Sequence, residues 1–456
     1  MIAVVFMLVL LVVAIVFASM GGPQLPVGPI LALTALFLGF FCAGIYIAAA
    51  LGILGLVIGF TFSDRPFWLF LGGAIWSPSS NFVFVAVPLF LLMGEILLRA
   101  GLSERLYRAL NVWLAPLPGG LLHTNIVSCG VFSAISGSSV ATAATMGSVA
   151  LPYFANTRYS PRQVLGSLAA GGALGNLIPP GITFIVYGLL TETSVGKMYV
   201  AAVLPSVLVM GLFLLVIVWH GLRSGRVEKG PKIPLRDKLA ALKDLVPTML
   251  LILIVLGSIY AGLATPTEAA ALGVVAAAVF AAIAGKLSLG MLNRSAEATA
   301  RSTAFIGLIL FGAYILNFIL TSLHVPQAMA MLVSGLPLPP WAIMAVIILF
   351  YLGLGTFMEG FAMVITTIPV IFPIVKALGY DPVWFGVVVT MVIEIAMISP
   401  PDGTVLYVLQ GMRPKPGPIS DIFIGVMPFL LVYMLAVYIL LLVPDIALWL
   451  PRTLGR

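Results

Sequence analysis

Two Pro-Pro pairs interrupt long apolar stretches of the chain, LIPPG at 177–181 and ISPPD at 398–402, and they lie 221 positions apart. Each proline lacks a backbone N–H and frees the carbonyl one turn earlier, so a helix breaks there and leaves oxygen atoms without partners. Broken helices near the middle of a bilayer present such oxygens and helix ends to ions and solutes. The two breaks are therefore the first candidates for binding chemistry.

The breaks belong to an internal repeat with a constant offset. Three further pairs share the offset of 221: Pro152 with Pro373, Tyr159 with Tyr380, and Pro161 with Pro382. Two halves with broken apolar segments in corresponding positions are the expected layout of a secondary transporter.

Small polar residues lie in the middle of the apolar stretch 125–153, namely Ser133, Ser136, Gly137, Ser138 and Ser139. They leave an arm of about 11 residues on the N-terminal side, or roughly 16 Å of helix. This is too short for a hydrocarbon core of roughly 30 Å. We expect a re-entrant helical hairpin at 125–153 whose tip is sheltered by protein. The counterpart at 353–375, with Gly355 and Gly360 around its turn, predicts a second hairpin.

Two interpretations of the first cluster stay open. Small residues allow helices to pack closely in membranes. Hydroxyls and freed carbonyls at a helix break also form an oxygen cage suited to Na⁺, and helix N-termini attract anions. The neighbouring break at 175–181 adds further carbonyls.

Three acidic residues lie in or beside the repeated apolar segments: Glu359, Glu394 and Asp402. Carboxylates inside a membrane are costly and point to a function, the alternative being structural hydrogen bonds. Glu95 has Arg99 four residues further on, which predicts a local ion pair.

The composition predicts an all-α, polytopic membrane protein. Hydrophobic residues make up 62% and charged residues 8% of 456 positions, which excludes an ordinary soluble domain. The three histidines match no metal-ligand spacing, and no P-loop is present. We find no arrangement of nucleophile, base and oxyanion donors, so we expect a transporter driven by an ion gradient or a partner rather than an enzyme.

Hydropathy predicts spans near 1–18, 27–42, 44–61, 83–98, 164–190, 199–219, 246–263, 268–285, 303–321, 339–354, 383–410 and 421–443. The first lacks the basic start of a signal peptide and is expected to be retained. The segment 103–115 predicts an amphipathic interfacial helix. A basic loop at 220–246 is expected on the cytoplasmic side.

These elements divide the chain into four parts. We expect scaffold spans at 1–82 and 199–302, the latter with the basic loop 220–246. First-repeat and second-repeat transport regions are expected at 83–198 and 303–443, each containing one hairpin.

Five segments carry a resemblance to a known family: VPLFLLMGEIL at 87–97, GVFSAISGSSVATAATMG at 130–147, LIPPG at 177–181, FMEGFAM at 357–363 and ISPPDG at 398–403. Together the chain resembles, along nearly its whole length, the large membrane subunit of tripartite ATP-independent periplasmic (TRAP) transporters. The resemblance implies an elevator-type Na⁺ symporter with two inverted repeats in the bacterial inner membrane. It implies uptake of an organic acid, such as a dicarboxylate, from a periplasmic substrate-binding protein. A small four-helix membrane subunit is the other implied partner, and Na⁺ as coupling ion is the only implied cofactor.

The family's motifs, matched residue by residue, imply two Na⁺ sites built mainly from backbone carbonyls. The first comprises Ser133, Ser136, Gly175, Ile178 and Pro179. The second comprises Gly355, Ala396, Ser399, Pro400 and Thr404. The candidates for substrate binding or coupling are Ser138, Ser139, Gly181, Glu359, Glu394 and Asp402.

The chain departs from the family at three of these candidates. Gly181 stands where Ser or Thr is frequent after the first Pro-Pro pair. Asp402 replaces an apolar residue after the second pair, and Glu359 replaces Asp in the hairpin.

Two alternatives are an ion channel and an ion-coupled anion transporter that works without a binding protein. A channel would line a continuous polar path, which the scarcity of polar residues disfavours.

Overall fold

The computed structural model describes residues 31, 34–37, 39–40, 45–63, 66–154, 157, 159–223, 233–355, 358–401 and 403–454. The predicted span 1–18, most of 27–42, and Asp402 lie outside these residues. Across the described part, the secondary structure is helical and contains no strand. The prediction of an all-α protein is therefore confirmed.

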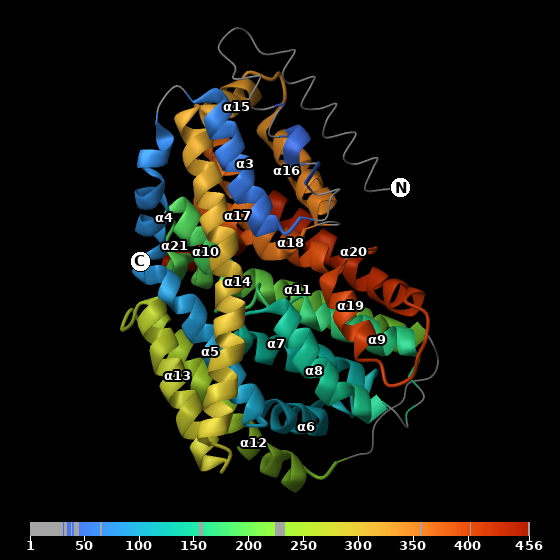
Figure 1. Ribbon diagram of the computed structural model, residues 1–456. Coiled ribbons are helices and arrows are strands. Elements are labelled where there is room, and N and C mark those ends of the chain that lie inside the picture. Colours follow the sequence, from blue (N-terminus) through green and yellow to red (C-terminus); the bar gives the residue numbers. More distant parts are fainter. Residues whose placement is uncertain are drawn as a thin grey trace.

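The first half contains α3 (Ile47–Phe62), η1 (Phe67–Leu69), α4 (Leu71–Ser79), η2 (Phe82–Val85), α5 (Ala86–Arg99), α6 (Leu102–Leu114), α7 (Gly120–Ser136), α8 (Ser139–Phe154), α9 (Pro161–Gly172), α10 (Ile182–Thr191) and α11 (Val195–Arg223). The second half contains α12 (Leu235–Tyr260), α13 (Pro266–Ile283), α14 (Leu289–Ser322), α15 (Val325–Ser334), α16 (Pro340–Leu354), α17 (Gly360–Ala377), α18 (Pro382–Met397), α19 (Thr404–Gly411), α20 (Ser420–Leu442) and α21 (Asp445–Thr453). Figure 1 shows their arrangement.

Seven helices of the described chain are long and apolar enough to cross a membrane: Phe82–Arg99, Val195–Leu222, Leu235–Tyr260, Pro266–Ile283, Leu289–Ser322, Gly360–Ala377 and Ser420–Leu442. The chain is thus a multi-pass membrane protein. The apolar stretches 164–190 and 383–410 each contain two helices, α9 with α10 and α18 with α19, separated at the Pro-Pro pairs.

The first predicted hairpin contains α7 and α8, which pack against each other. The first arm starts at Gly120 rather than at 125, because the chain turns at Gly119, whose φ is +94°. With 17 residues, α7 is about 26 Å long, still shorter than a hydrocarbon core of about 30 Å.

The boundaries of the second hairpin differ from the prediction. Its tip is flanked by α16 and α17, so the range 353–375 covers the tip and second arm but omits the first arm. Hydropathy predicted that arm, 339–354, as a separate span. A continuous apolar run of 15 residues gives no internal sign that the chain turns at its end.

The predicted basic loop 220–246 is largely helical where the structure describes it. Helix α11 continues to Arg223, and α12 starts at Leu235 after Pro234. The predicted amphipathic helix 103–115 is confirmed as α6, with the pair Arg108–Glu104 at 3.2 Å on its exposed side.

The two halves repeat in structure at the offset found in the sequence. Helices α8 and α17 start 221 positions apart, as do α9 and α18. Helices α9 and α18 both have Pro at their start, directly after a capping residue. Ser160 Oγ accepts a hydrogen bond from Gln163 N, and Asp381 Oδ1 accepts one from Val383 N. Such caps satisfy the free N–H groups of a first turn.

Glycines let several helices touch backbone to backbone. A Cβ at Gly166 in α9 would lie 2.2 Å from the carbonyl oxygen of Gly425 in α20. A Cβ at Gly312 in α14 would lie 2.5 Å from the carbonyl oxygen of Ala48 in α3. Close contact through small residues replaces the hydrophobic effect, which cannot drive helices together in lipid.

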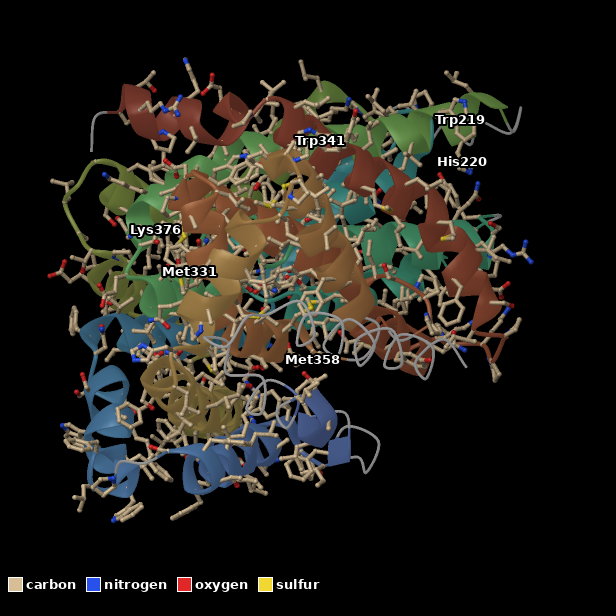
Figure 2. The ribbon with its side chains drawn as sticks, turned by 90° about the horizontal axis from the view of Figure 1, so that it is seen from above. Trp219, His220, Met331, Trp341, Met358 and Lys376 are labelled. Carbon is tan, nitrogen blue, oxygen red and sulfur yellow. The ribbon has the colours of Figure 1, made fainter. Side chains whose placement is uncertain are left out.

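The long helix α14 packs along α3 and α5 and connects two parts of the molecule (Figure 1). Seen from above, α3, α4 and α14 form a group to one side of the other helices, and Met358 of the second hairpin tip lies on the side of those helices nearest this group (Figure 2). The predicted domain boundaries at 198/199 and 302/303 fall inside α11 and α14. The division into moving and fixed parts stays a prediction.

Gly166→Ala should destabilise the protein by about 1–3 kcal/mol, because the added methyl group has no room against α20. Gly211→Ala is the matched control, since a Cβ there meets nothing within 4 Å and should stabilise α11 by up to about 1 kcal/mol. Thermal unfolding in detergent, followed by tryptophan fluorescence, measures both. Equal unfolding midpoints for the two variants would contradict the close contact.

Candidate ion and substrate sites

The first hairpin turns within two residues. Helix α7 ends at Ser136, α8 begins at Ser139, and Gly137 adopts φ +59°. The Gly137 N–H donates to the carbonyl of Ser133 at 3.0 Å. Ser133 Oγ donates to the carbonyl of Cys129 at 2.7 Å. The Ser133 hydroxyl group near the tip is therefore hydrogen-bonded within its own helix, α7.

This tip lies directly against the first Pro-Pro break. The carbonyl of Gly137 accepts a hydrogen bond of 3.1 Å from Ile182 N at the start of α10. A Cβ at Gly137 would lie 2.5 Å from the carbonyl oxygen of Pro180. A Cβ at Gly175 would lie 2.3 Å from Ser139 Cα. Only glycine permits these contacts, so the hairpin tip and the broken helix meet backbone to backbone.

The structure thus brings together the segments that carry the first predicted Na⁺ site. Ser136 Oγ lies 2.6 Å from Thr142 Oγ1, and Ile178 packs beside Gly130 of α7. Gly181 lies at the end of the break, and a Cβ there would fall 1.9 Å from the carbonyl oxygen of Asn176. Ser138 Oγ accepts from Ala141 N at 3.4 Å.

The second predicted Na⁺ site repeats this arrangement. Gly355 at the end of α16 lies so close to Ala396 that a Cβ on it would fall 1.9 Å from the Ala396 Cβ. The carbonyl of Ser399 accepts from Gly403 N at 3.0 Å, and the peptide bond before Pro401 is cis, as is the one before Pro180. The second hairpin therefore also rests on a broken helix.

A cavity of about 290 Å³ opens beside the second site. Its lining comprises Gly355, Met358, Glu359, Met397, Thr404, Tyr407 and Val408. Glu359 Oε2 accepts from the backbone N–H groups of Phe361 at 3.0 Å and Ala362 at 3.3 Å, so this carboxylate caps α17. A second cavity, of about 210 Å³, reaches Glu359 from the side of α3.

Glu394 makes a different set of contacts. This carboxylate is fully buried in α18, and Ser139 Oγ lies 2.7 Å from its Oε1 and 2.6 Å from its Oε2. Asn176 Nδ2 donates to Glu394 Oε1 at 2.8 Å and to Ser139 Oγ at 2.9 Å. Two predicted residues from opposite halves, Ser139 and Glu394, are thereby joined both directly and through Asn176, which was not predicted from the sequence.

A second missed residue is Thr183, which corresponds to Thr404 at the offset of 221. Each stands in the first turn of the helix that follows a Pro-Pro break. Both hydroxyl groups are buried, and neither has a hydrogen-bond partner among the residues that the structure describes. The internal repeat was the signal that could have paired Thr183 with the predicted Thr404.

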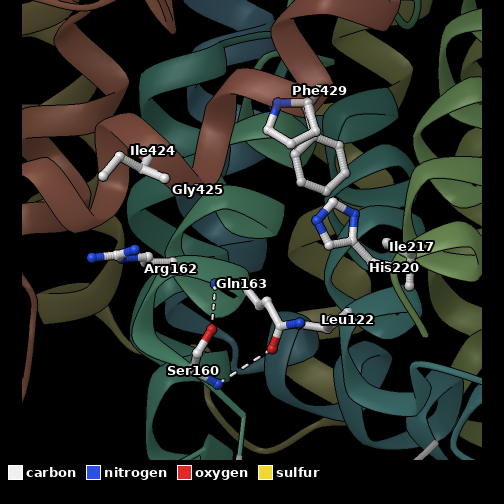
Figure 3. A pocket seen from close by; sticks show the side chains of 10 residues that line it. Leu122, Ser160, Arg162, Gln163, Ile217, His220, Ile424, Gly425 and Phe429 are labelled. Carbon is white, nitrogen blue, oxygen red and sulfur yellow. Dashed lines mark hydrogen bonds between the residues drawn. The ribbon is translucent and has the colours of Figure 1, made fainter. Parts of the chain in front are cut away.

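A further cavity, of about 250 Å³, contains none of the predicted residues (Figure 3). It lies between α7, α9, α11 and α20, and its lining includes Arg162 and His220.

The predicted ion pair of Arg99 with Glu95 is confirmed, with 3.1 Å between Arg99 Nη2 and Glu95 Oε2.

Comparisons with known proteins agree with this architecture. A family model described as "Tripartite ATP-independent periplasmic transporter, DctM component" matches residues 11–446. The C4-dicarboxylate TRAP transporter large permease protein DctM of Pseudomonas aeruginosa is 33% identical over 382 residues, which cover 84% of this chain and 89% of that protein. The isethionate TRAP transporter permease protein DctMQ of Oleidesulfovibrio alaskensis is 31% identical, with 85% of this chain and 61% of that protein covered.

Among solved structures, the YdaH transporter of Alcanivorax borkumensis superposes with a TM-score of 0.63 at 18% identity. The match covers 91% of this chain and 99% of that chain. At this identity the likeness shows the fold alone, which is that of a polytopic helical transporter.

Replacing either partnerless hydroxyl by a methyl group should stabilise the protein in the absence of ions. An unsatisfied buried hydroxyl group destabilises a protein by about 1–3 kcal/mol, and Thr183→Val and Thr404→Val each remove one such group. Thr390→Val is the control, because that hydroxyl donates to the carbonyl of Gly386 at 2.8 Å and its loss should destabilise. Thermal unfolding in Na⁺-free buffer measures all three. Lower unfolding midpoints for Thr183→Val and Thr404→Val would show that these hydroxyls are satisfied.

Proposed function

The chain belongs to the DctM component family of tripartite ATP-independent periplasmic (TRAP) transporters, and on that premise we propose that it couples uptake of an organic acid to the Na⁺ gradient. It is a multi-pass inner-membrane transporter and not an enzyme. Uptake of substrate through a TRAP system is its general function.

The observation that carries the Na⁺ proposal is the contact between the first hairpin tip and the first Pro-Pro break. The C-terminal ends of α7 and α9 bring carbonyl oxygens to this contact, and a helix C-terminus carries a partial negative charge. In the proposal, carbonyls of Gly175, Ile178 and Pro179 bind Na⁺ together with Ser133 and Ser136. An ion that replaces missing backbone partners is stabilised without any full charge on the protein.

The second Na⁺ ion is proposed to bind where Gly355 meets the second break. Carbonyls between Ala396 and Pro400 would be its ligands, with the hydroxyl groups of Ser399 and Thr404. The buried Thr404 Oγ1 without a partner supports this, because such a group gains a ligand when an ion binds.

The cavity beside the second break is the proposed substrate site. Its volume of about 290 Å³ is near the lower end of the range of about 300–1,000 Å³ for small-molecule pockets. The carboxylate of Glu359 repels a substrate carboxylate, so the acid group would face Thr404 and the N-terminus of α19. Glu359 would instead face Na⁺ or a hydroxyl or amino group of the substrate. The Pseudomonas aeruginosa relative, named for C4-dicarboxylates, supports the choice of an organic acid.

We assign an elevator mechanism to this cycle, with the two hairpins and two broken helices moving together against the remaining spans. The partners in the proposal are a periplasmic substrate-binding protein and a small membrane subunit. The isethionate relative supports the second partner, because its name joins M and Q components and its length exceeds the matched part.

Uptake should require Na⁺ and should be electrogenic. If two net positive charges enter per cycle, a membrane potential of about 100 mV contributes roughly 4.6 kcal/mol, enough for accumulation above about a thousandfold. The complete transporter in proteoliposomes, with internal potential set by a K⁺ gradient, measures this. Unchanged uptake after replacing Na⁺ by choline would refute the proposal.

Variants of Ser136 should separate hydroxyl from carbonyl binding at the first site. Ser136→Ala removes a hydroxyl and should raise the Na⁺ half-saturation about tenfold or less, for roughly 1 kcal/mol of lost interaction. Ser136→Pro also disturbs the backbone and should abolish uptake. Ser148→Ala is the control, since that hydroxyl donates within α8 to the carbonyl of Thr145. The same half-saturation for Ser136→Ala, Ser133→Ala, Ser148→Ala and the wild type would favour packing as the role of these serines.

A further inference from the structure

The most unusual polar contact in the described chain joins the two repeats deep inside the protein. Glu394 and Ser139 are each 0% exposed and Asn176 is 3% exposed. Asn176 contributes both its side chain and its backbone N–H, which donates to Ser139 Oγ at 3.2 Å. Within the described part of the chain, Glu394 therefore accepts hydrogen bonds only from groups of the first repeat.

The internal repeat does not dictate this contact. At the offset of 221, Ser139 corresponds to Gly360, and Asn176 corresponds to Met397. These two counterparts form an apolar contact, because a Cβ at Gly360 would lie 3.4 Å from Met397 Sδ. Glu394 itself corresponds to Ala173. A purely symmetric core would have no use for a buried carboxylate, whose desolvation is costly.

The contact lies between the two candidate ion sites. Asn176 directly follows Gly175, which packs on Ser139 at the first tip. On the other side, Glu394 stands two residues before Ala396, which packs under Gly355. A shift of either broken helix must therefore stretch or compress the bonds of Glu394.

We propose that Glu394 is a positioning residue that couples the two Na⁺ sites. The inference rests on the proposed function. Na⁺ at the first site fixes the backbone at Gly175 and Asn176, which sets the position of Glu394 and hence of Ala396 at the second site. Binding at one site thereby favours binding at the other, and by linkage the effect is reciprocal.

The test is a Na⁺ titration of the purified full chain in lipid nanodiscs, at constant ionic strength with choline chloride. Binding is followed as a Na⁺-dependent rise in the thermal unfolding midpoint and as a change in tryptophan fluorescence. The wild type should show a Hill coefficient clearly above one. Glu394→Leu should lower it towards one, since both sites then fill independently.

Two further variants distinguish coupling from stability. Glu394→Gln keeps the size and can keep the bonds to Ser139 and Asn176, so its Hill coefficient should stay near that of the wild type. Thr390→Val removes a buried hydroxyl one turn earlier in α18 that bonds only within its own helix, so it should change the unfolding midpoint but not the Hill coefficient. The double variant Ser139→Ala/Asn176→Ala removes both side chains that bond to Glu394 and decides the matter if Glu394→Leu does not fold.

The outcomes separate the two proposals. A wild type that does not respond to Na⁺ refutes the proposed function and this inference with it. A wild type that binds Na⁺ with a Hill coefficient of one refutes the inference alone. So does a Hill coefficient that the double variant Ser139→Ala/Asn176→Ala and any folded Glu394→Leu leave unchanged.

Discussion

The backbone of a helix that stops inside a membrane must find its hydrogen-bond partners in the protein, because lipid offers none. The chain meets this requirement by placing each break against a hairpin tip. The Gly137 carbonyl accepts from Ile182 N, and glycine at 137 and 175 lets the two backbones touch. The same requirement brings the carbonyl oxygens of the broken helix and of the hairpin tip to one place, which is where the proposed function puts its first ion.

The duplicated architecture holds two sites of different chemistry. At the first break the tip contact is polar, through Ser139 and Asn176, whereas at the second the corresponding residues Gly360 and Met397 pack through apolar atoms. The second site instead has a carboxylate at its tip, Glu359. The fold repeats because both halves must shelter a broken helix, while individual side chains are free to diverge once the backbone contacts are secured.

The sequence predicted those features that depend on local chemistry. Proline pairs located both breaks, the serine cluster located the first hairpin, and the pattern of 103–115 predicted α6, because each follows from a few adjacent residues. Asn176 could not be found in this way, since its role depends on Glu394, which lies 218 positions away. The first arm of the second hairpin was taken as a span, because an apolar helix of 15 residues looks alike whether the chain turns back or continues.

Glu359 links the start of α17 to the cavity beside the second break. Its Oε2 accepts both backbone bonds that cap α17, and the same carboxylate lines the cavity next to the second break. A cation or donor that binds to this carboxylate weakens its hydrogen bonds to the first turn of α17. An anion that repels the carboxylate displaces it from those N–H groups. Because the cap satisfies free N–H groups of the first turn of α17, a change at Glu359 acts on the start of that helix. The proposed substrate cavity and the start of α17 therefore share one carboxylate, so that a ligand at Glu359 acts on both.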